Sequence, residues 1–312
     1  MSESWRIVFM GTSDFACPSL KILAEGEDIV AGVFTQPDRP QGRGLRIQQT
    51  PVKTLAQQHE IPVFQPEKLN RSLDMVLQCN PDLIVVAAYG QILSQKVLDI
   101  PRHGCINIHA SLLPKYRGAA PITWALVRGE TASGVTTMLM NKDLDAGDIL
   151  LQQEVAIDPD ETAGALHDRL ARVGAELLAS TIRGWKRKAI IPRRQDESLV
   201  TYAPLLKKED GLIDWTQPAN VIHNLVRGMN PWPGAYTFLQ EELLKVFAVQ
   251  PAPTFETEKA GTIVSVNDHG IMVAAGKGAV IVTEVQLQGR KRLPIAEFLR
   301  GRPLKPGTRL GK

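Results

Sequence analysis

The stretch Leu83-Ile84-Val85-Val86-Ala87-Ala88 decides the fold, because an unbroken apolar run with several β-branched residues is typical of a strand buried on both faces. Similar apolar runs occupy residues 6–10, 29–34 and 105–109. Segments with helical periodicity separate these runs. Repeated alternation of strand and helix predicts a mostly parallel sheet with helices on both faces.

Further segments complete the predicted first domain. Residues 134–140 form a strand rich in Val, Thr and Met, and residues 149–157 are expected to pair with it. Residues 161–183 have the pattern of a long amphipathic helix. Residues 12–14, Thr-Ser-Asp, are suited to capping the helix that follows the first strand. Residues 1–188 are therefore predicted to be an α/β domain of Rossmann-like class.

The remainder of the chain has a different character. Residues 189–205 are basic and polar, and we interpret them as a linker. After one helical stretch at residues 218–227, short strands alternate with Pro and Gly. This pattern predicts that residues 206–312 form a small C-terminal β-barrel, similar to an OB-fold.

Composition limits the classes to which the chain can belong. Of its 312 residues, 44% are hydrophobic and 22% are charged, which excludes disorder or a coiled coil as a description of the whole. No apolar run approaches the ~20 residues that span a bilayer, and no signal-peptide pattern is present, so a cytoplasmic protein without membrane contact is expected. Cys17, Cys79 and Cys105 have no metal-ligand spacing and are interpreted as small apolar core residues.

The net charge of +3 is unevenly distributed. Basic residues gather in two clusters, which consist of Arg183, Lys186, Arg187, Lys188, Arg193 and Arg194 and, near the end of the chain, of Arg290, Lys291, Arg292, Arg300, Arg302, Lys305, Arg309 and Lys312. Such clusters favour a polyanionic partner, but an ordinary solvated surface can have the same composition. Charge alone leaves both interpretations open.

Polar residues suited to catalysis end the strand at residues 105–109. Asn107 and His109 are two positions apart, so their side chains project from the same face. The carboxyl ends of strands are where open α/β sheets bind ligands. An amide and an imidazole at this place can stabilise an oxyanion and move a proton, or they can simply fix a turn.

Two common kinds of ligand site are missing from the sequence. Gly11 alone follows the first strand, so neither a dinucleotide fingerprint nor a P-loop is present. A calcium loop needs a side-chain oxygen at its fifth position and glycine at its sixth. In the acidic loop at residues 143–148 these two positions hold Gly147 and Asp148, which is the reverse order, so no metal is expected. The loop is either a simple turn or the source of a carboxylate that pairs with His109. The sequence alone does not show whether one of its carboxylates contacts His109.

The segment Thr35–Arg46 is longer than an ordinary α/β connection. Its glycines and prolines would display Arg39, Arg43 and Arg46 to the solvent. Long basic loops of this kind usually bind a ligand, although a flexible insertion would have the same composition.

These segments together resemble the formyltransferases that use 10-formyltetrahydrofolate as donor. The resemblance rests on Asn107-Ile108-His109, on the following Ser111-Leu112-Leu113-Pro114, and on Leu144-Asp145-Ala146-Gly147-Asp148. It implies that an amine attacks the formyl carbon and that a tetrahedral oxyanion forms. Asn107 and His109 would donate to that oxyanion or relay protons, while Asp145 would hold His109.

The resemblance also implies a folate site and a macromolecular partner. The folate would lie among apolar residues and backbone, namely Val86, Ala88, Tyr89, Gly90, Ile92, Ser111, Leu112, Leu113, Pro114 and Asp143. The segments that resemble the members of the family acting on methionyl initiator tRNA are residues 35–44, 50–53, 211–215 and 230–235. The tRNA would contact Arg39, Arg43, Arg46, Arg290, Lys291 and Arg292.

Arg43 is the residue expected to read the acceptor stem, although the arginines of its loop could instead bind the glutamate tail of the folate. Nothing in the sequence demands more than a monomer.

A formyltransferase acting on an amino-sugar nucleotide would share Asn107, His109 and Asp145 but lack the arginine loop and basic tail. A glycinamide ribonucleotide formyltransferase would lack the barrel. An inactive RNA-binding module or a folate hydrolase is a further alternative.

Overall fold

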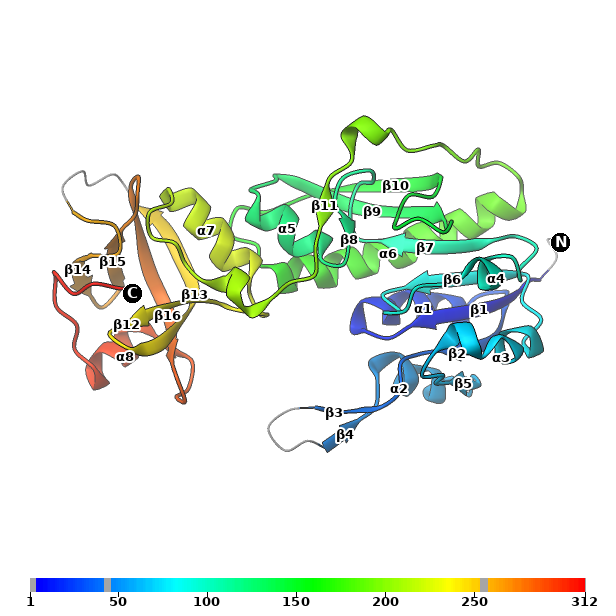
Figure 1. Cartoon of the computed structure of the whole chain (residues 1–312), viewed down its shortest axis with the longest axis horizontal. Helices are drawn as coiled ribbons and strands as arrows, with labels where there is room; N and C mark the ends of the chain where they lie inside the picture. Colours follow the sequence, from blue (N-terminus) through cyan, green and yellow to red (C-terminus); the bar gives the residue numbers. More distant parts are fainter. Residues whose placement is uncertain (1–3, 42–45, 253–257, 312) are drawn as a thin grey trace. The chain divides into compact units, whose positions relative to one another are not determined.

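The apolar run at Leu83–Ala87 forms strand β6, the central strand of a seven-stranded sheet (Figure 1). A computed structural model describes the chain over residues 4–41, 46–252 and 258–311. The chain divides into two compact units. The first unit comprises residues 1–118, 132–156 and 167–202, and the second comprises residues 119–131, 157–166 and 203–312.

The sheet of the first unit has the strand order β10-β9-β7-β6-β1-β2-β5. The strands from β7 to β5 are parallel, and β9 is antiparallel to both of its neighbours, as the mostly parallel sheet predicted from the sequence requires. The strands besides β6 are β1 (Arg6–Gly11), β2 (Ile29–Phe34), β5 (Val63–Phe64), β7 (Cys105–His109), β9 (Ala132–Leu139) and β10 (Ile149–Ala156).

Helices cover both faces of this sheet. On one face, Val8 and Ile84 pack in a single apolar cluster with Val76 and Val97 of the covering helices α3 and α4. On the other face, Gly174 of α6 allows this helix to approach β7 and β9 closely. The helices are α1 (Cys17–Ala24), α2 (Pro51–Gln58), α3 (Leu73–Gln78), α4 (Gln95–Leu98) and α6 (Ala163–Lys186), of which residues 167–186 belong to the first unit. No helix in the described ranges has the length and apolarity to cross a membrane.

Two local features differ from the sequence-based expectation. Ser13 precedes the short 3-10 helix η1 (Asp14–Ala16), but its side chain makes no capping hydrogen bond. Thr12 Oγ1 instead donates to the carbonyl of Tyr89 at 2.7 Å, so this hydroxyl ties two strand ends together rather than capping a helix. The long connection after β2 contains a short antiparallel hairpin, β3 (Arg39–Gln41) with β4 (Arg46–Gln48), which its high polarity concealed.

The second unit is built on an antiparallel sheet of order β12-β13-β16-β15-β14, with β17 paired to β16. Near the C-terminus, Leu310 bridges the end of β12 at Leu239, and Arg309 bridges Thr262 beside β14. These bridges join the two edge strands, which closes the sheet into the small barrel that was predicted. Its strands are β12 (Ala235–Leu239), β13 (Glu242–Ala252), β14 (Ile263–Asn267), β15 (Gly270–Ala274), β16 (Ala279–Leu287) and β17 (Leu293–Pro294).

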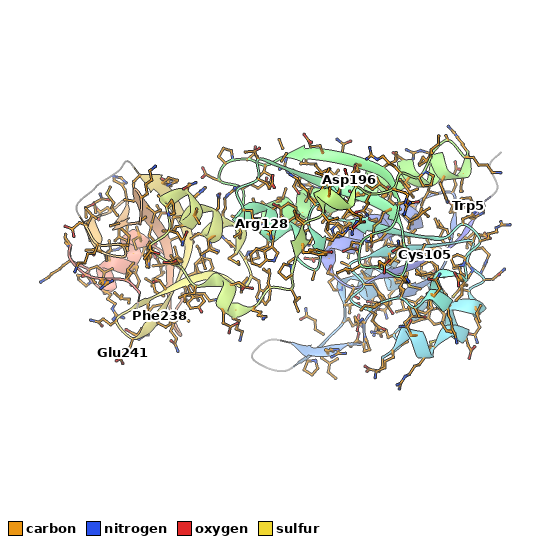
Figure 2. All side chains as sticks on the ribbon, turned by 45° about the horizontal axis from the view of Figure 1, so that its top comes forward. Trp5, Cys105, Arg128, Asp196, Phe238 and Glu241 are labelled. Carbon is orange, nitrogen blue, oxygen red and sulfur yellow. The ribbon has the colours of Figure 1, made fainter. Side chains whose placement is uncertain are left out.

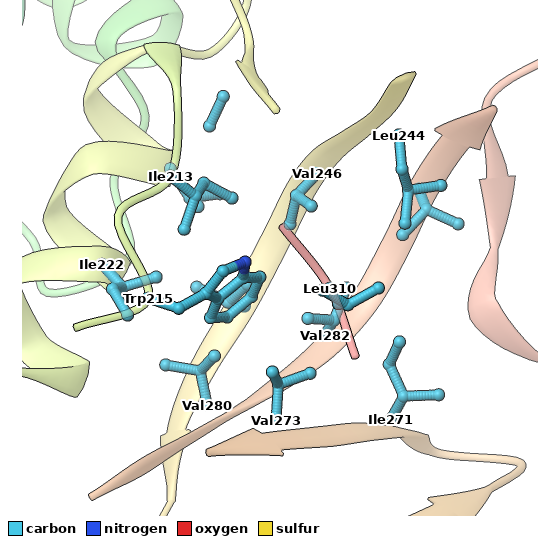
Figure 3. Close-up of a cluster of buried hydrophobic side chains, with 14 of the residues drawn as sticks. Ile213, Trp215, Ile222, Leu244, Val246, Ile271, Val273, Val280, Val282 and Leu310 are labelled. Atoms are coloured by element: carbon cyan, nitrogen blue, oxygen red, sulfur yellow. The ribbon is translucent and has the colours of Figure 1, made fainter. Parts of the chain in front are cut away.

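Trp215 lies within the apolar core of the barrel (Figure 3). Trp215 is 5% exposed, and its Nε1 donates to Thr237 Oγ1 at 2.9 Å, so the one polar atom of the buried indole has a partner. Three helices accompany the barrel in this unit. They are α5 (Pro121–Val127), α7 (Ala219–Gly228) and α8 (Ile295–Gly301), the last of which was not predicted.

Candidate active site

The carboxyl ends of β1, β6 and β7 meet at one edge of the sheet. Gly11 at the end of β1 pairs with Ala87 of β6, and Val86 pairs with Asn107 of β7. Register therefore brings a predicted folate residue, Val86, beside a predicted catalytic residue. This edge is where an open parallel sheet binds its ligands.

Asn107 offers a free amide at this edge. It lies between Val86 and Met138 in the sheet and is half-buried. Within the described residues its side chain has no hydrogen-bonding partner. An amide N–H that is positioned by strand pairing and not used by the fold is suited to binding an oxygen of a substrate.

His109 is held on both sides of its ring. The side chain is 6% exposed, and Nε2 donates to the carbonyl of Tyr116 at 2.9 Å. Nδ1 faces the carboxylate of Asp145, with 3.7 Å between Nδ1 and Oδ2. The pairing that the sequence left open is therefore present. A carboxylate in this position orients the ring and stabilises positive charge on it.

The loop that contains Asp145 is fixed by backbone contacts. Asp145 Oδ2 accepts a hydrogen bond of 2.8 Å from the amide of Gly118, and Gln195 Nε2 donates to the carbonyls of Asp145 and Gly147. A Cβ on Gly147 would lie 1.6 Å from the carbonyl oxygen of Leu139, so no side chain fits there. The carboxylate is thus placed by the fold before any ligand binds.

Three residues at this edge have positive φ angles although they are not glycine. They are Ala88 at 43°, Tyr116 at 63° and Asp145 at 49°. Left-handed backbone is unfavourable for residues with a side chain and concentrates at functional sites. Each of the three follows or contacts a strand end, which supports this edge as the site of chemistry.

Hydrogen bonds and apolar contacts hold the segment that follows β7 in place. Ser111 Oγ donates to the carbonyl of Lys115 at 2.6 Å, and the amide of Leu113 donates to Thr136 Oγ1. Leu113 packs with Met138 and Ile149 in a small apolar cluster. Leu112 and Pro114 are partly buried, so this predicted folate segment is a rigid wall rather than a flexible loop.

A cavity of about 520 Å³ lies beside the loop after β6. Two predicted folate residues, Gly90 and Ile92, line it together with Gln36, Glu67, Lys68, Asn70, Arg71 and Gln91. Ile92 is 81% exposed, and Ala88 is also exposed. Tyr89 is buried, which raises the pKa of its phenol. Asp143 is exposed in the acidic loop and does not line this cavity.

The cysteines are unsuited to act as nucleophiles. Cys105, labelled in Figure 2, is 2% exposed, and burial raises the pKa of its thiol to about 12. Burial also raises the pKa of Cys17 to about 11. Raised values keep thiols protonated at neutral pH. In the described part of the chain, no group of His, Cys, Asp and Glu side chains is arranged to hold a metal ion.

The arginines predicted to bind tRNA differ in their surroundings. Arg43 lies outside the described residues, and only the backbone of Arg46 is described. Arg39 is exposed in β3, with Glu67 at 3.8 Å. In the second unit, Arg290 and Lys291 are exposed.

Arg292, by contrast, is already engaged within its own unit. It makes two short hydrogen bonds to the carboxylate of Glu284, and its guanidinium lies 4.2 Å from the ring centre of Phe247. A carboxylate and an aromatic ring therefore both compete with any phosphate for this side chain.

Sequence reasoning missed two residues that hold the site. Tyr116 supplies the carbonyl that fixes His109, from seven positions further along the chain. Gln195 belongs to the segment interpreted as a linker, yet it binds the Asp145 loop from 50 residues away in the chain. No local pattern could have indicated that contact.

The chain belongs to the formyl transferase family, since the family's model matches residues 5–182 and the model of its C-terminal domain matches residues 205–303. More particularly, it is similar to curated methionyl-tRNA formyltransferases. That of Geobacter sulfurreducens is 54% identical over 310 residues, which cover 98% of this chain and 97% of the relative.

Solved structures with the same fold are more distant in sequence. A sugar 3N-formyl transferase, WlaRD, solved in the presence of dTDP and 5-N-formyl-THF, is 18% identical, with a TM-score of 0.68 over 93% of this chain and all of that chain. HypX from Aquifex aeolicus in complex with tetrahydrofolic acid is 19% identical, with a TM-score of 0.63 over 95% of this chain and 47% of that chain.

Proposed function

We propose that this chain transfers the formyl group of 10-formyltetrahydrofolate to the α-amino group of methionyl initiator tRNA. The observation that carries the proposal is the free amide of Asn107 beside the His109–Asp145 pair, in a chain more than half identical to a methionyl-tRNA formyltransferase. The product would be the formylmethionyl-tRNA with which translation begins.

The reaction needs an oxyanion donor and a path for one proton. The amine nitrogen forms a bond to the formyl carbon, and the carbonyl electrons move onto oxygen. Asn107 donates its unused N–H to that oxygen. The bond from carbon to N10 of the folate then breaks as the carbonyl reforms. The attacking amine loses a proton and N10 gains one, which leaves the enzyme unchanged.

His109 and Asp145 serve the proton transfer. Because the ring of His109 is buried and oriented by Tyr116, the ring needs little reorganisation during the reaction. Nε2 donates to the Tyr116 carbonyl, so the proton in transit is carried on Nδ1, where the carboxylate of Asp145 stabilises the charged ring. Asp145 therefore acts on the chemistry through His109.

The folate donor would bind in the cavity beside the loop after β6. A volume of about 520 Å³ lies within the range of ~300–1,000 Å³ found for small-molecule sites. Gly90 and Ile92 would contact the ligand there, and Lys68 and Arg71 line the same cavity and suit its carboxylates. The apolar residue nearest Asn107 in register is Val86, which would lie against the pterin.

For the tRNA, we propose contacts from the arginine loop at residues 39–46 and from Arg290 and Lys291. Exposed basic side chains bind the phosphate backbone without reading its sequence. Reading of initiator identity is assigned to Arg43, because RNA recognition favours loops, ends and weakly paired positions that such a loop could reach.

The test is a formylation assay with purified protein, 10-formyltetrahydrofolate and either methionyl-tRNA or a dTDP-amino sugar. We expect formylmethionyl-tRNA and no formylated sugar. Formylation of the sugar alone would keep the chemistry of Asn107 and His109 but replace the tRNA with an amino-sugar nucleotide as acceptor.

A further inference from the structure

Arg117 is a buried cation next to the residues that hold His109 and Asp145. Its side chain is 4% exposed. Nε and Nη2 both donate to Gln195 Oε1, at 3.0 and 2.8 Å, and Nη1 and Nη2 donate to the two carboxylate oxygens of Glu197. The hydrogen bond from Arg117 lowers the pKa of the Glu197 carboxyl, so this ion pair stays charged at neutral pH. The planar guanidinium therefore holds two side chains of one segment.

The amide of Gln195 has one favourable orientation between its partners. Because Oε1 accepts from Arg117, Nε2 faces the opposite way and donates to the carbonyls of Asp145 and Gly147, at 2.8 Å each. The reverse orientation would place Nε2 against N–H donors and Oε1 against two carbonyl oxygens. The guanidinium of Arg117 therefore fixes which atom of Gln195 contacts the loop at residues 143–148.

This loop needs support from outside because part of its backbone is unfavourable by itself. Asp145 has a φ of 49°, and a residue with a side chain keeps such a left-handed conformation only when its surroundings hold it. The hydrogen bond from Gln195 to the carbonyl of Asp145 acts directly on this backbone. The carboxylate of the same residue faces His109 Nδ1 at 3.7 Å, so a shift of the backbone changes the distance between the two groups.

The neighbours of Arg117 in the chain contact the same pair. The carbonyl of Tyr116 accepts from His109 Nε2 at 2.9 Å. The amide of Gly118 donates to Asp145 Oδ2 at 2.8 Å. Arg117 stands between these two residues, and its side chain orients the amide that holds the loop. The ring, the carboxylate and the guanidinium are thus parts of one hydrogen-bonded network.

We propose that Arg117 and Gln195 are positioning residues for formyl transfer, because they set the carboxylate of Asp145 at its place beside His109. Both act on the reaction through Asp145 rather than by touching the reacting atoms. Their role rests on the proposed function, in which Asp145 stabilises the charged ring of His109. A segment interpreted from the sequence as a linker thereby contributes to the rate of the reaction.

The first experiment measures steady-state kinetics of Gln195→Met, which keeps the length of the side chain and removes its polar atoms. We expect kcat to fall about 10- to 100-fold, because displacement of a catalytic group is costly, while KM for the donor and for the tRNA stays within about twofold. Gln153→Met, at an exposed position of β10, is the matched control and should keep the kcat of the wild type.

A double-mutant cycle distinguishes positioning from a general effect on the fold. If Gln195 acts only through the charge of Asp145, Gln195→Met should change kcat by less than about twofold in the Asp145→Asn background. Two independent effects would multiply instead. The proposal is overturned if the two effects multiply, or if Gln195→Met alone keeps the kcat of the wild type.

Two further variants keep the test decisive if Gln195→Met does not fold. Gln195→Glu can still accept from Arg117 but has no N–H for the carbonyls of Asp145 and Gly147, so we expect a similar fall in kcat. Arg117→Lys keeps the buried charge but lacks the planar fork that orients Gln195, and kcat should fall here as well. An unchanged kcat in the folded variants contradicts the proposal.

Nitrogen NMR of isotope-labelled histidine rings gives a readout that does not depend on the acceptor. The signals of His109 are those that disappear in His109→Gln. We expect the Nδ1 resonance of His109 to shift in Gln195→Met and to stay unchanged in Gln153→Met. If this shift is present but no tRNA is formylated, the proposed function fails and the placement of Asp145 by Gln195 stands. If tRNA is formylated and neither kcat nor the Nδ1 resonance responds to Gln195→Met, the positioning role alone is wrong.

Discussion

At the scale of single residues, the proposed chemistry depends on an amide that the fold leaves unused. We predict that Asn107→Ala lowers kcat about 100- to 1000-fold, because one oxyanion donor is lost. Binding of tRNA should persist. Steady-state kinetics and filter binding measure the two effects. Asn220→Ala, at an exposed position of α7, is the matched control. A kcat within twofold of the wild type for Asn107→Ala would remove this residue from the mechanism.

The charge of Asp145 can be tested without disturbing its loop. In Asp145→Asn the side-chain oxygen can still accept from the amide of Gly118, but the negative charge facing His109 is gone. We predict a fall in kcat of about 100-fold or more with little change in Tm.

The chain provides a second His–Asp pair for comparison. His167 Nδ1 lies 3.0 Å from Asp168 Oδ1, and the side chain of Asp168 is 75% exposed. Asp168→Asn should leave kcat unchanged. Equal effects of the two substitutions on kcat would mean that His109 does not need the charge of its partner.

At the scale of elements, the loop at residues 143–148 must pack against the end of β9. We predict that Gly147→Ala lowers both Tm and kcat, because its Cβ would overlap the carbonyl of Leu139 and displace Asp145. Gly301→Ala is the control, since a Cβ there meets nothing within 4 Å. Calorimetry and kinetics on both variants check this. An unchanged Tm for Gly147→Ala would show that the loop can shift freely.

The helices and strands also show which parts of the fold and of the candidate site could be predicted from the sequence. The strands at residues 29–34 and 105–109 were predictable because continuous apolar runs report burial on both faces. Polarity hid the hairpin of β3 and β4, whose pairing does not depend on apolar alternation. The catalytic candidates were recognised from local motifs and a family resemblance. The contact of Gln195 with the Asp145 loop was not, because it is a product of tertiary folding.

At the scale of the whole molecule, affinity for tRNA is expected to depend on salt. We predict that replacing both Arg290 and Lys291 with Ala reduces the slope of log K against log salt by about one to two. Arg292→Ala should reduce it less, because Glu284 and the ring of Phe247 already engage this side chain. Filter binding over a salt series measures both slopes. A larger effect of Arg292→Ala would show that its ion pair opens for RNA.

The central claim is that this chain formylates methionyl initiator tRNA. The most direct measurement compares the rate of formylmethionine formation from 10-formyltetrahydrofolate with methionyl initiator tRNA and with methionyl elongator tRNA. The account predicts fast formylation of the initiator and far slower formylation of the elongator. Consumption of the donor without formylation of either tRNA would contradict it.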